Sequence, residues 1–202
     1  MTILIILDFV GVFVFAMSGL LTASNKRMDL FGGFIIAFVT ALGGGTLRDL
    51  LLDAEISWIT NTYYLYTVLA GAIFALVVKK RANKLRKTIF LFDSIGISVF
   101  TIVGIQKGFS LSLPVEIVII VGVITATFGG VIRDILCNEI PLIFRKEIYA
   151  TACIIGGIMY ASLFHLGLNE ITNMIFSGTT IVFIRIVAVK KKISLPLIND
   201  KI

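Results

Sequence analysis

The chain has little charge and few proline, cysteine and histidine residues. Only 15% of its 202 residues are charged, whereas about a quarter of an ordinary soluble domain is charged. A water-soluble fold of this length needs more polar side chains to cover its surface, and a disordered chain needs fewer apolar ones, so both classes are excluded. With 58% hydrophobic residues, 16 Phe and 3 Pro, the composition is typical of an all-α membrane protein that crosses the bilayer several times.

Two cysteines and one histidine leave little room for redox, metal or acid–base chemistry. Cys137 and Cys153 lie in apolar runs, where cysteine is a small core residue rather than half of a disulfide. No zinc, nucleotide-binding or catalytic motif is present, so we expect no enzyme activity, no cofactor and no metal site. The net charge of +6 is explained by basic residues at membrane edges and does not indicate nucleic acid.

Seven hydrophobic runs are long enough to cross a hydrocarbon core of roughly 30 Å as helices. They cover residues 3–22, 30–53, 61–78, 88–106, 113–137, 147–166 and 171–189. Seven spans put the termini on opposite sides, and one set of connections carries nearly all the lysines and arginines. That set comprises Lys26, Arg27, Lys79, Lys80, Arg81, Lys84, Arg86, Lys87, Arg145, Lys146, Lys190, Lys191, Lys192 and Lys201, against Lys107 on the other side. The positive-inside rule predicts an inner-membrane protein with its N-terminus outside, its C-terminus in the cytoplasm, and basic loops able to contact anionic lipid.

A duplication with an offset of 85 residues runs through the chain. Asp8 recurs as Asp93, and the Arg-Asp pair at 48–49 recurs at 133–134. Further pairs at this offset are Gly11 and Gly96, Gly19 and Gly104, and Tyr64 and Tyr149. Because each unit holds three spans, the second enters the membrane from the opposite face, which predicts an inverted repeat. The predicted divisions are a first three-helix repeat at 1–87, a second, inverted repeat at 88–169, a seventh helix at 170–189 and a basic cytoplasmic tail at 190–202.

Glycines cluster at matching positions in the second and fifth spans, in ALGGGTLRD (41–49) and ATFGGVIRD (126–134). A helical glycine costs about 1 kcal/mol relative to alanine, so we expect both helices to break there and to turn backbone groups toward an ion path. The predicted path consists of Thr40, Gly43, Gly44, Gly45, Asp49, Thr125, Phe128, Gly129, Gly130 and Asp134. Alternatively, the glycines only allow close helix packing, and the threonines bond their own helices.

The arginines inside the spans need partners. Arg48 and Asp49 are adjacent and project about 100° apart on a helix, so they are not expected to face each other. We predict instead that Arg48 pairs with Asp8 and, by symmetry, that Arg133 pairs with Asp93, as structural ties, functional groups or both. Arg185, near the end of the last span, is expected to extend to the cytoplasmic interface.

The motifs GGGTLRD and FGGVIRD, in two three-helix units followed by a seventh helix, resemble the prokaryotic branch of the trimeric intracellular cation (TRIC) channel family. They also resemble bacterial membrane proteins with tandem glycine-transporter domains. The resemblance covers residues 3–189 and implies a homotrimer in which each subunit has its own pore, with a path at Gly43–Gly45 and Gly129–Gly130. Phe128 replaces the first glycine of the second triplet, which implies either a less open break or a constriction.

Three functions are compatible with these features. The first, which we favour, is a monovalent cation channel that conducts K⁺, with Na⁺ as the other candidate ion, in which carbonyls and aspartates replace part of the ion's hydration and the arginines are neutralised. The second is a secondary transporter of glycine or another small zwitterion, whose carboxylate would meet Arg48 or Arg133. The third, a non-transporting structural protein, leaves the duplicated charges unexplained.

Overall fold

The computed structural model describes residues 2–81 and 85–196, and this part of the chain is helical, as predicted. The elements are α1 (Thr2–Asn25), α2 (Leu30–Leu51), α3 (Ser57–Thr60), α4 (Tyr63–Arg81), α5 (Leu85–Ser110), α6 (Val115–Leu136), the 3₁₀ helix η1 (Leu142–Phe144), α7 (Ala150–His165) and α8 (Glu170–Lys191). Each of the seven predicted runs overlaps one long α-helix, and α1, α4, α5 and α8 extend beyond the predicted bounds. The short elements α3 and η1, which we did not predict, follow α2 and α6 and begin 85 residues apart.

Local residues set the ends of these helices. Asp29 caps α2 by accepting a hydrogen bond from the N–H of Gly32 at 2.6 Å, and Asn169 caps α8 in the same way. Just beyond α2 and α6, Asp53 and Asn138 adopt left-handed backbone conformations, with φ of 50° and 54°. Asp and Asn tolerate this conformation better than other non-glycine residues, so both helices stop at equivalent points.

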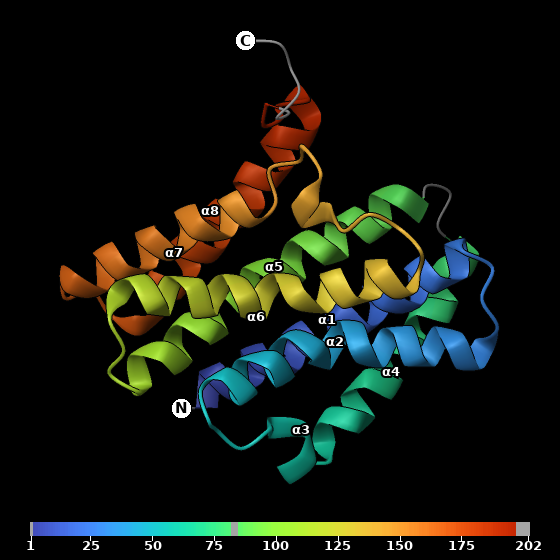
Figure 1. Cartoon of the computed structure of the whole chain (residues 1–202), viewed down its shortest axis with the longest axis horizontal. Coiled ribbons are helices and arrows are strands. Elements are labelled where there is room, and N and C mark those ends of the chain that lie inside the picture. The colour runs from blue at the N-terminus through green and yellow to red at the C-terminus, as the bar shows by residue number, and fades with distance from the viewer. Residues whose placement is uncertain (1, 82–84, 197–202) are drawn as a thin grey trace.

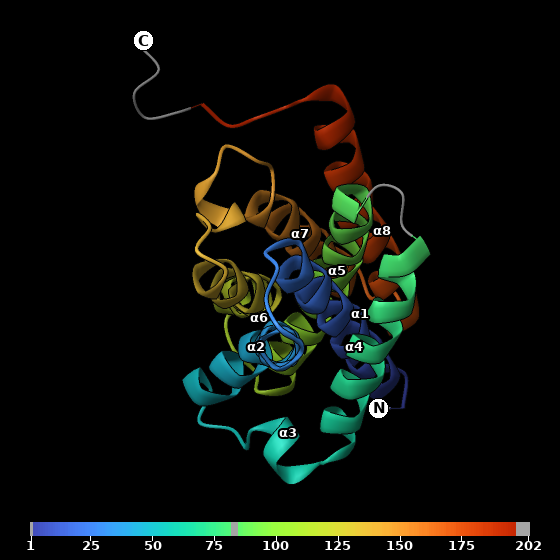
Figure 2. The same cartoon turned by 90° about the vertical axis from the view of Figure 1, so that its right-hand side faces the viewer.

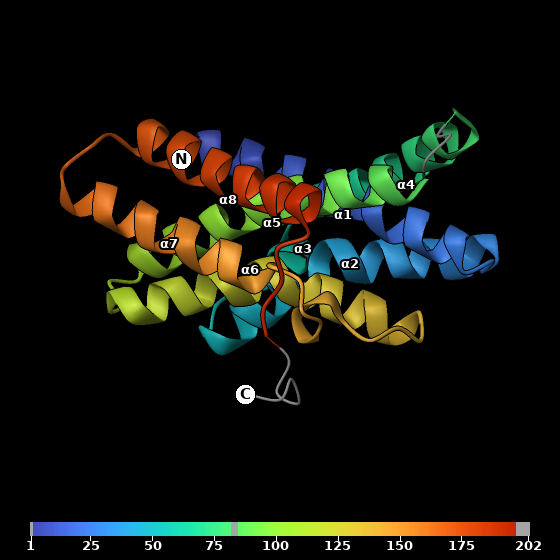
Figure 3. The ribbon, with the colours of Figure 1, turned by 90° about the horizontal axis from the view of Figure 1, so that it is seen from above.

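Five helices, α1, α2, α5, α6 and α8, are long and apolar enough to cross a membrane, judged by length and composition. The other two are shorter, with apolar stretches at Tyr63–Val77 in α4 and Ala150–His165 in α7. The colour order in Figures 1 and 3 shows α1, α4, α6 and α8 running one way along the bundle and α2, α5 and α7 the other way. We call the end at which α1 and α6 finish the basic end.

The centre of the bundle consists of α1, α2, α5 and α6, with α1 packed on α5 and α2 packed on α6 (Figure 2). On one flank α4 packs directly on α1. On the other flank α8 packs on α5, and α7 packs mainly on α8 and α6. On the first flank α4 lies beside α1, whereas on the other flank α8 occupies the equivalent place beside α5. The two flanks therefore differ.

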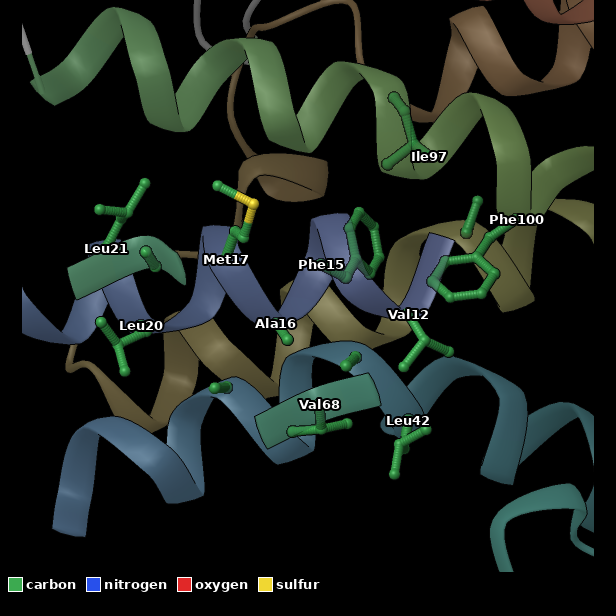
Figure 4. Close-up of a cluster of buried hydrophobic side chains, with 14 of the residues drawn as sticks. Val12, Phe15, Ala16, Met17, Leu20, Leu21, Leu42, Val68, Ile97 and Phe100 are labelled. Carbon is green, nitrogen blue, oxygen red and sulfur yellow. The ribbon is translucent and has the colours of Figure 1, made fainter. Parts of the chain in front are cut away.

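Apolar side chains, most of them from the central helices and others from flanking helices such as Val68 of α4, form the core (Figure 4). Phe15 of α1 and Phe100 of α5 meet edge to face, with ring centroids 5.0 Å apart. Each ring also lies against a glycine of the opposite helix, so that a Cβ on Gly96 would overlap Phe15 and one on Gly11 would crowd Phe100. The two contacts are reciprocal and repeat at the 85-residue offset.

The prediction that the second and fifth spans break at their glycines is wrong. Both α2 and α6 remain helical through residues 43–45 and 128–130 (Figure 1). The glycines instead permit a close crossing, because a Cβ on Gly44 would overlap the Thr125 carbonyl oxygen and a Cβ on Gly129 would overlap that of Thr40. Tight packing of small residues between apolar helices outweighs the low helix propensity of glycine here, as the alternative interpretation held.

Candidate functional site

Two buried arginine–aspartate clusters, one near each end of the bundle, repeat the same geometry. In the last turn of α2, Arg48 Nε donates to Asp49 Oδ1 at 2.8 Å, and in the last turn of α6, Arg133 Nε donates to Asp134 Oδ1 at the same distance. Our expectation that the adjacent residues would not face each other is wrong, because the long arginine side chain folds back over the helix end. All four side chains are buried.

The second oxygen of each aspartate holds the chain that follows the helix. Asp49 Oδ2 accepts from the N–H and the hydroxyl of Ser57, at 3.3 and 3.2 Å, at the start of α3. Asp134 Oδ2 accepts from the N–H of Leu142, at 3.2 Å, at the start of η1. Each aspartate therefore neutralises an arginine and also fixes the first turn of a short helix.

The predicted pair of Arg133 and Asp93 is confirmed. Arg133 Nη1 lies 2.9 Å from Asp93 Oδ1 and also donates to the hydroxyl of Ser18 at 3.0 Å. One arginine thereby joins α1, α5 and α6. We call Ser18, Asp93, Arg133, Asp134 and Tyr149, together with Arg185, the Arg133 cluster.

The predicted pair of Arg48 and Asp8 is wrong. Both side chains are described, and no N–O distance between them falls within the 4.0 Å of an ion pair. Asp8 instead accepts a hydrogen bond from the Tyr64 hydroxyl of α4 at 2.5 Å, while Arg48 is held by Asp49. We call Asp8, Arg48, Asp49, Ser57 and Tyr64 the Arg48 cluster.

Arg185 does not extend to the interface, contrary to our expectation. Its side chain is 1% exposed, donates to the carbonyl of Ile148 at 2.9 Å, and lies 3.7 Å from Asp93 Oδ2. Its guanidinium also sits over the rings of Phe90 and Tyr149, at 5.0 and 4.9 Å. A buried carboxylate and two ring faces satisfy the charge better than a stretched side chain would, so α8 adds a second arginine to this cluster.

A cavity adjoins each cluster. The first, of about 260 Å³ including open solvent, is lined among others by Asp8, Gly45, Arg48 and Asp49. The second, of about 1220 Å³ including open solvent, reaches the basic end and is lined among others by Asp93, Arg133, Asp134 and Arg185. The structure thus brings the four predicted intramembrane charges and both predicted path aspartates to these two cavities.

The remaining predicted path residues line neither cavity. They are Thr40, Gly43, Gly44, Thr125, Phe128, Gly129 and Gly130. The hydroxyls of Thr40 and Thr125 each donate to their own helix, to the carbonyls of Ile36 and Val121 at 2.6 Å. Phe128 is half-buried. Their role in ion conduction therefore remains a prediction.

Sequence reasoning missed several members of the clusters. Tyr64 and Tyr149 recur at the 85-residue offset, so the duplication alone could have marked them. Ser57 lies in a short helix without a hydrophobic period, and Arg185 lies outside the duplication; the sequence carries no comparable signal for either. Trp58, which donates from Nε1 to the Thr46 hydroxyl at 2.9 Å beside the first cavity, was also missed.

Comparison with known proteins gives consistent relatives over nearly the whole chain. A family model described as "Glycine transporter" matches twice, at residues 5–80 and 90–165. A UPF0126 membrane protein of Vibrio cholerae is 39% identical over 197 residues, covering 96% of this chain and 82% of its own. The UPF0126 inner membrane protein YadS of Escherichia coli K12 is 38% identical over 193 residues, covering 94% and 93%.

Solved structures match the fold as closely. The TRIC trimeric intracellular cation channel orthologue from Rhodobacter sphaeroides has a TM-score of 0.90 and 31% identity, over 96% of this chain and all of that chain. A TRIC cation channel whose structure addresses conductance has a TM-score of 0.85 and 36% identity, over 98% of each chain. These relatives are membrane proteins and channels rather than enzymes, and the chain belongs to the bacterial UPF0126 membrane proteins described by the glycine transporter model, within the TRIC family.

Proposed function

We propose that the protein is a monovalent cation channel that conducts K⁺. Each subunit carries its own path, which runs between the first cavity, beside the Arg48 cluster, and the second cavity, beside the Arg133 cluster. The observation that carries this proposal is the full-length likeness to TRIC cation channels. The cavities add chemical support, because each presents carboxylates at membrane depth, where ionisable groups are costly unless they serve ions or structure. The path needs no cofactor, and Na⁺ is the competing permeant ion.

The proposal includes an inverted repeat of two three-helix units, followed by α8 as a seventh crossing. The opposite directions of α1 and α5 (Figure 1) and the recurrence of contacts at the 85-residue offset support this arrangement. The basic residues at the ends of α1, α6 and α8 favour a cytoplasmic C-terminus and an external N-terminus. By analogy with the trimeric relatives we also propose a homotrimer, whose basic end faces anionic lipid.

Neutralised arginines make a cation path electrostatically acceptable. In the Arg48 cluster, Asp8 and Asp49 outnumber Arg48, which leaves a formal charge of −1 beside the first cavity. In the Arg133 cluster, Asp93 and Asp134 balance Arg133 and Arg185. Neither cavity therefore presents an unpaired arginine that would repel a cation.

In this proposal, apolar packing between the two cavities closes the path. Along α1, Val12 lines the first cavity and Thr22 lines the second, and Phe15 between them packs against Phe100 of α5. Conduction therefore requires α1 and α5 to separate these two rings. Hydrophobic constrictions of this kind gate channels by excluding water.

The competing function is secondary transport of glycine or another small zwitterion. The description of the family model and the presence of both an arginine and aspartates at each cavity favour it. The substrate carboxylate would meet Arg48 and its ammonium would meet Asp8, with the mirrored arrangement at Arg133 and Asp93.

Purified protein in planar bilayers distinguishes the two functions. We expect unitary K⁺ currents of many ions per opening, and no saturable glycine counterflow in liposomes. In Asp8→Asn the loss of the excess negative charge should lower the K⁺ conductance at low salt at least roughly twofold. Asp53→Asn, an exposed change of the same charge just beyond α2, is the matched control. Silent bilayers combined with glycine counterflow would reverse the assignment.

A further inference from the structure

A third cavity, of about 520 Å³ including open solvent, lies between α5, α7 and α8 at the end opposite the basic end. Its polar wall consists of Gln106 from α5 with Glu170 and Asn173 from α8. Gln106 Nε2 donates to Glu170 Oε1 at 2.6 Å and to the Tyr160 hydroxyl at 2.9 Å. None of these residues belongs to the Arg48 or Arg133 cluster, so the cavity is separate from the proposed path.

Two amide oxygens in this wall are unpaired. Gln106 is 8% exposed and Asn173 is fully buried, yet neither Gln106 Oε1 nor Asn173 Oδ1 has a hydrogen-bond partner among the described residues. Asn173 Nδ2 makes only a long bond, of 3.4 Å, to the Leu168 carbonyl. Buried acceptors are normally paired, so this wall suits a ligand that donates hydrogen bonds.

The duplicated unit shows that packing alone does not require polar groups at this place. The residues 85 positions before Gln106 and Tyr160 are Leu21 and Ala75, which are apolar and fully buried. Glu170 and Asn173 stand on α8, which lies outside the duplication. The polar wall is therefore specific to the second half of the chain and is not a feature of the repeated fold.

The opposite wall is aromatic. Phe109 stacks on Phe164 with ring centroids 4.4 Å apart and lies 6.2 Å from Tyr160. The faces of such rings attract cations and cover hydrocarbon. Glu170 is the only formally charged residue among the seven that line the cavity, so the cavity combines a negative charge, free acceptors and apolar rings.

We propose that this cavity binds a small organic ammonium ion, such as a primary alkylamine. Its N–H groups donate to Gln106 Oε1, Asn173 Oδ1 and the Glu170 carboxylate, and its hydrocarbon part lies on Phe109 and Phe164. A bare metal ion fits less well, because the lining of the cavity offers one carboxylate and two amide side chains, whereas hard cations favour several carboxylate and carbonyl oxygens arranged around them. Within residues 2–81 and 85–196 no group of three or more His, Cys, Asp or Glu side chains is placed to hold one.

Binding can be measured on the purified, folded protein by isothermal titration with n-butylammonium chloride, with n-butanol and sodium chloride as matched controls. We expect saturable binding of the ammonium and none of the alcohol. Glu170→Gln, which keeps the shape of the side chain, should weaken binding at least roughly tenfold, because a charged hydrogen bond is lost. Glu116→Gln, an exposed change at the start of α6, should bind as the wild type does.

A second variant keeps the test independent of the carboxylate. Gln106→Leu introduces the residue that the first unit carries at position 21, so the protein should fold and lose ammonium binding. Absence of saturable binding to the wild type, or equal binding by Glu170→Gln, would overturn the proposal. Neither result bears on conduction, because the assay measures no current and the cavity shares no residue with either arginine cluster.

Discussion

The Arg48 cluster and the Arg133 cluster share two aspartates, an arginine and a tyrosine 85 positions apart, yet they distribute their ion pairs differently. In both, the arginine binds the following aspartate and that aspartate holds a short helix. In the Arg48 cluster, the remaining aspartate, Asp8, accepts a hydrogen bond from the Tyr64 hydroxyl. In the Arg133 cluster, the remaining aspartate, Asp93, forms an ion pair with Arg133 itself.

The difference follows from α8, which has no counterpart in the first half. Arg185 of α8 sits over the ring of Tyr149, and the Tyr149 hydroxyl has no hydrogen-bond partner among the described residues. Within the described residues, no cation sits over the ring of its counterpart Tyr64, whose hydroxyl donates to Asp8. With Arg185 from α8, the Arg133 cluster is formally neutral and its ion pairs link several helices. The Arg48 cluster has no such helix and keeps one excess carboxylate beside its cavity.

The two halves remain alike where α2 and α6 cross at Gly44 and Gly129. Substitutions at this crossing should have the largest effects on stability. Gly44→Leu and Gly129→Leu each place a side chain where a carbonyl oxygen of the opposite helix lies. We expect each to destabilise the protein by about 3 kcal/mol or more and to reduce the yield of folded protein in detergent. Size-exclusion profiles and thermal unfolding followed by circular dichroism provide the measurement. A large effect at one position and none at the other would mean that Gly44 and Gly129 are not equivalent at the crossing of α2 and α6.

Arg133 and Arg48 should differ in their contribution to stability. Arg133→Gln leaves Asp93 and Asp134 buried with less compensation, and breaking a buried pair costs about 3–5 kcal/mol. Arg48→Gln leaves only Asp49, which keeps its bonds to Ser57, so the loss should be smaller by about 2 kcal/mol. Thermal unfolding of the two variants compares them directly. Adding Asp93→Asn to Arg133→Gln should recover part of the loss, because it removes the unpaired charge.

Much of the fold was predictable from the sequence because apolar runs and a repeated offset are properties of the chain itself. The seven long helices overlap the seven runs, and the offset indicated the pairing of Arg133 with Asp93 before any contact was known. Helix continuity at Gly44 and Gly129 was not predictable, because glycine has the same low intrinsic propensity in a broken helix and in a tight crossing. Only the position of the opposite carbonyl oxygens decides between them.

The arginine partners show a second limit of the sequence. We predicted that Arg48 would pair with Asp8 and, by symmetry, that Arg133 would pair with Asp93, but only the second pair forms. The partner of each aspartate depends on whether the nearby tyrosine hydroxyl donates to it. Tyr64 donates to Asp8, whereas Tyr149 lies under Arg185 of α8 and has no such bond. Arg185 carries no sequence signal for a partner, because its partners are a carbonyl, two ring faces and the carboxylates of Asp93 and Glu147, all from other segments.

Alanine substitutions at two equivalent glycines should have opposite effects. A Cβ on Gly45 would meet only Arg48 Nη2, at 3.8 Å, whereas a Cβ on Gly130 would lie 2.9 Å from the Tyr149 hydroxyl. Gly45→Ala should therefore stabilise the protein, by up to about 1 kcal/mol from helix propensity. Gly130→Ala should destabilise it by about 1 kcal/mol, because Tyr149 is buried and must shift. Equal effects in chemical or thermal unfolding would mean that α8 does not restrict Tyr149.

The smallest expected difference lies on the surface of the basic end. Lys26 and Arg145 donate hydrogen bonds to Glu139 and lower the pKa of its carboxyl group, whereas the equivalent position in the first half is Ala54 and has no carboxylate. A carboxyl whose pKa is lower in the folded state stabilises the protein above its unfolded pKa, and this contribution is lost as the pH falls through the folded value.

The unfolding temperature of Glu139→Gln should therefore lie slightly below that of the wild type near neutral pH, and the gap should close in acid. The effect should be small because the pair is exposed and screened by salt. Glu55→Gln, at the opposite end, is the matched control, since Glu55 is exposed and has no ion-pair partner in the part of the chain that the structure describes. If the difference in unfolding temperature persists in acid, Glu139 stabilises the protein through packing rather than through its charge. The electrostatic difference between the two ends of the bundle would then depend on the buried clusters alone.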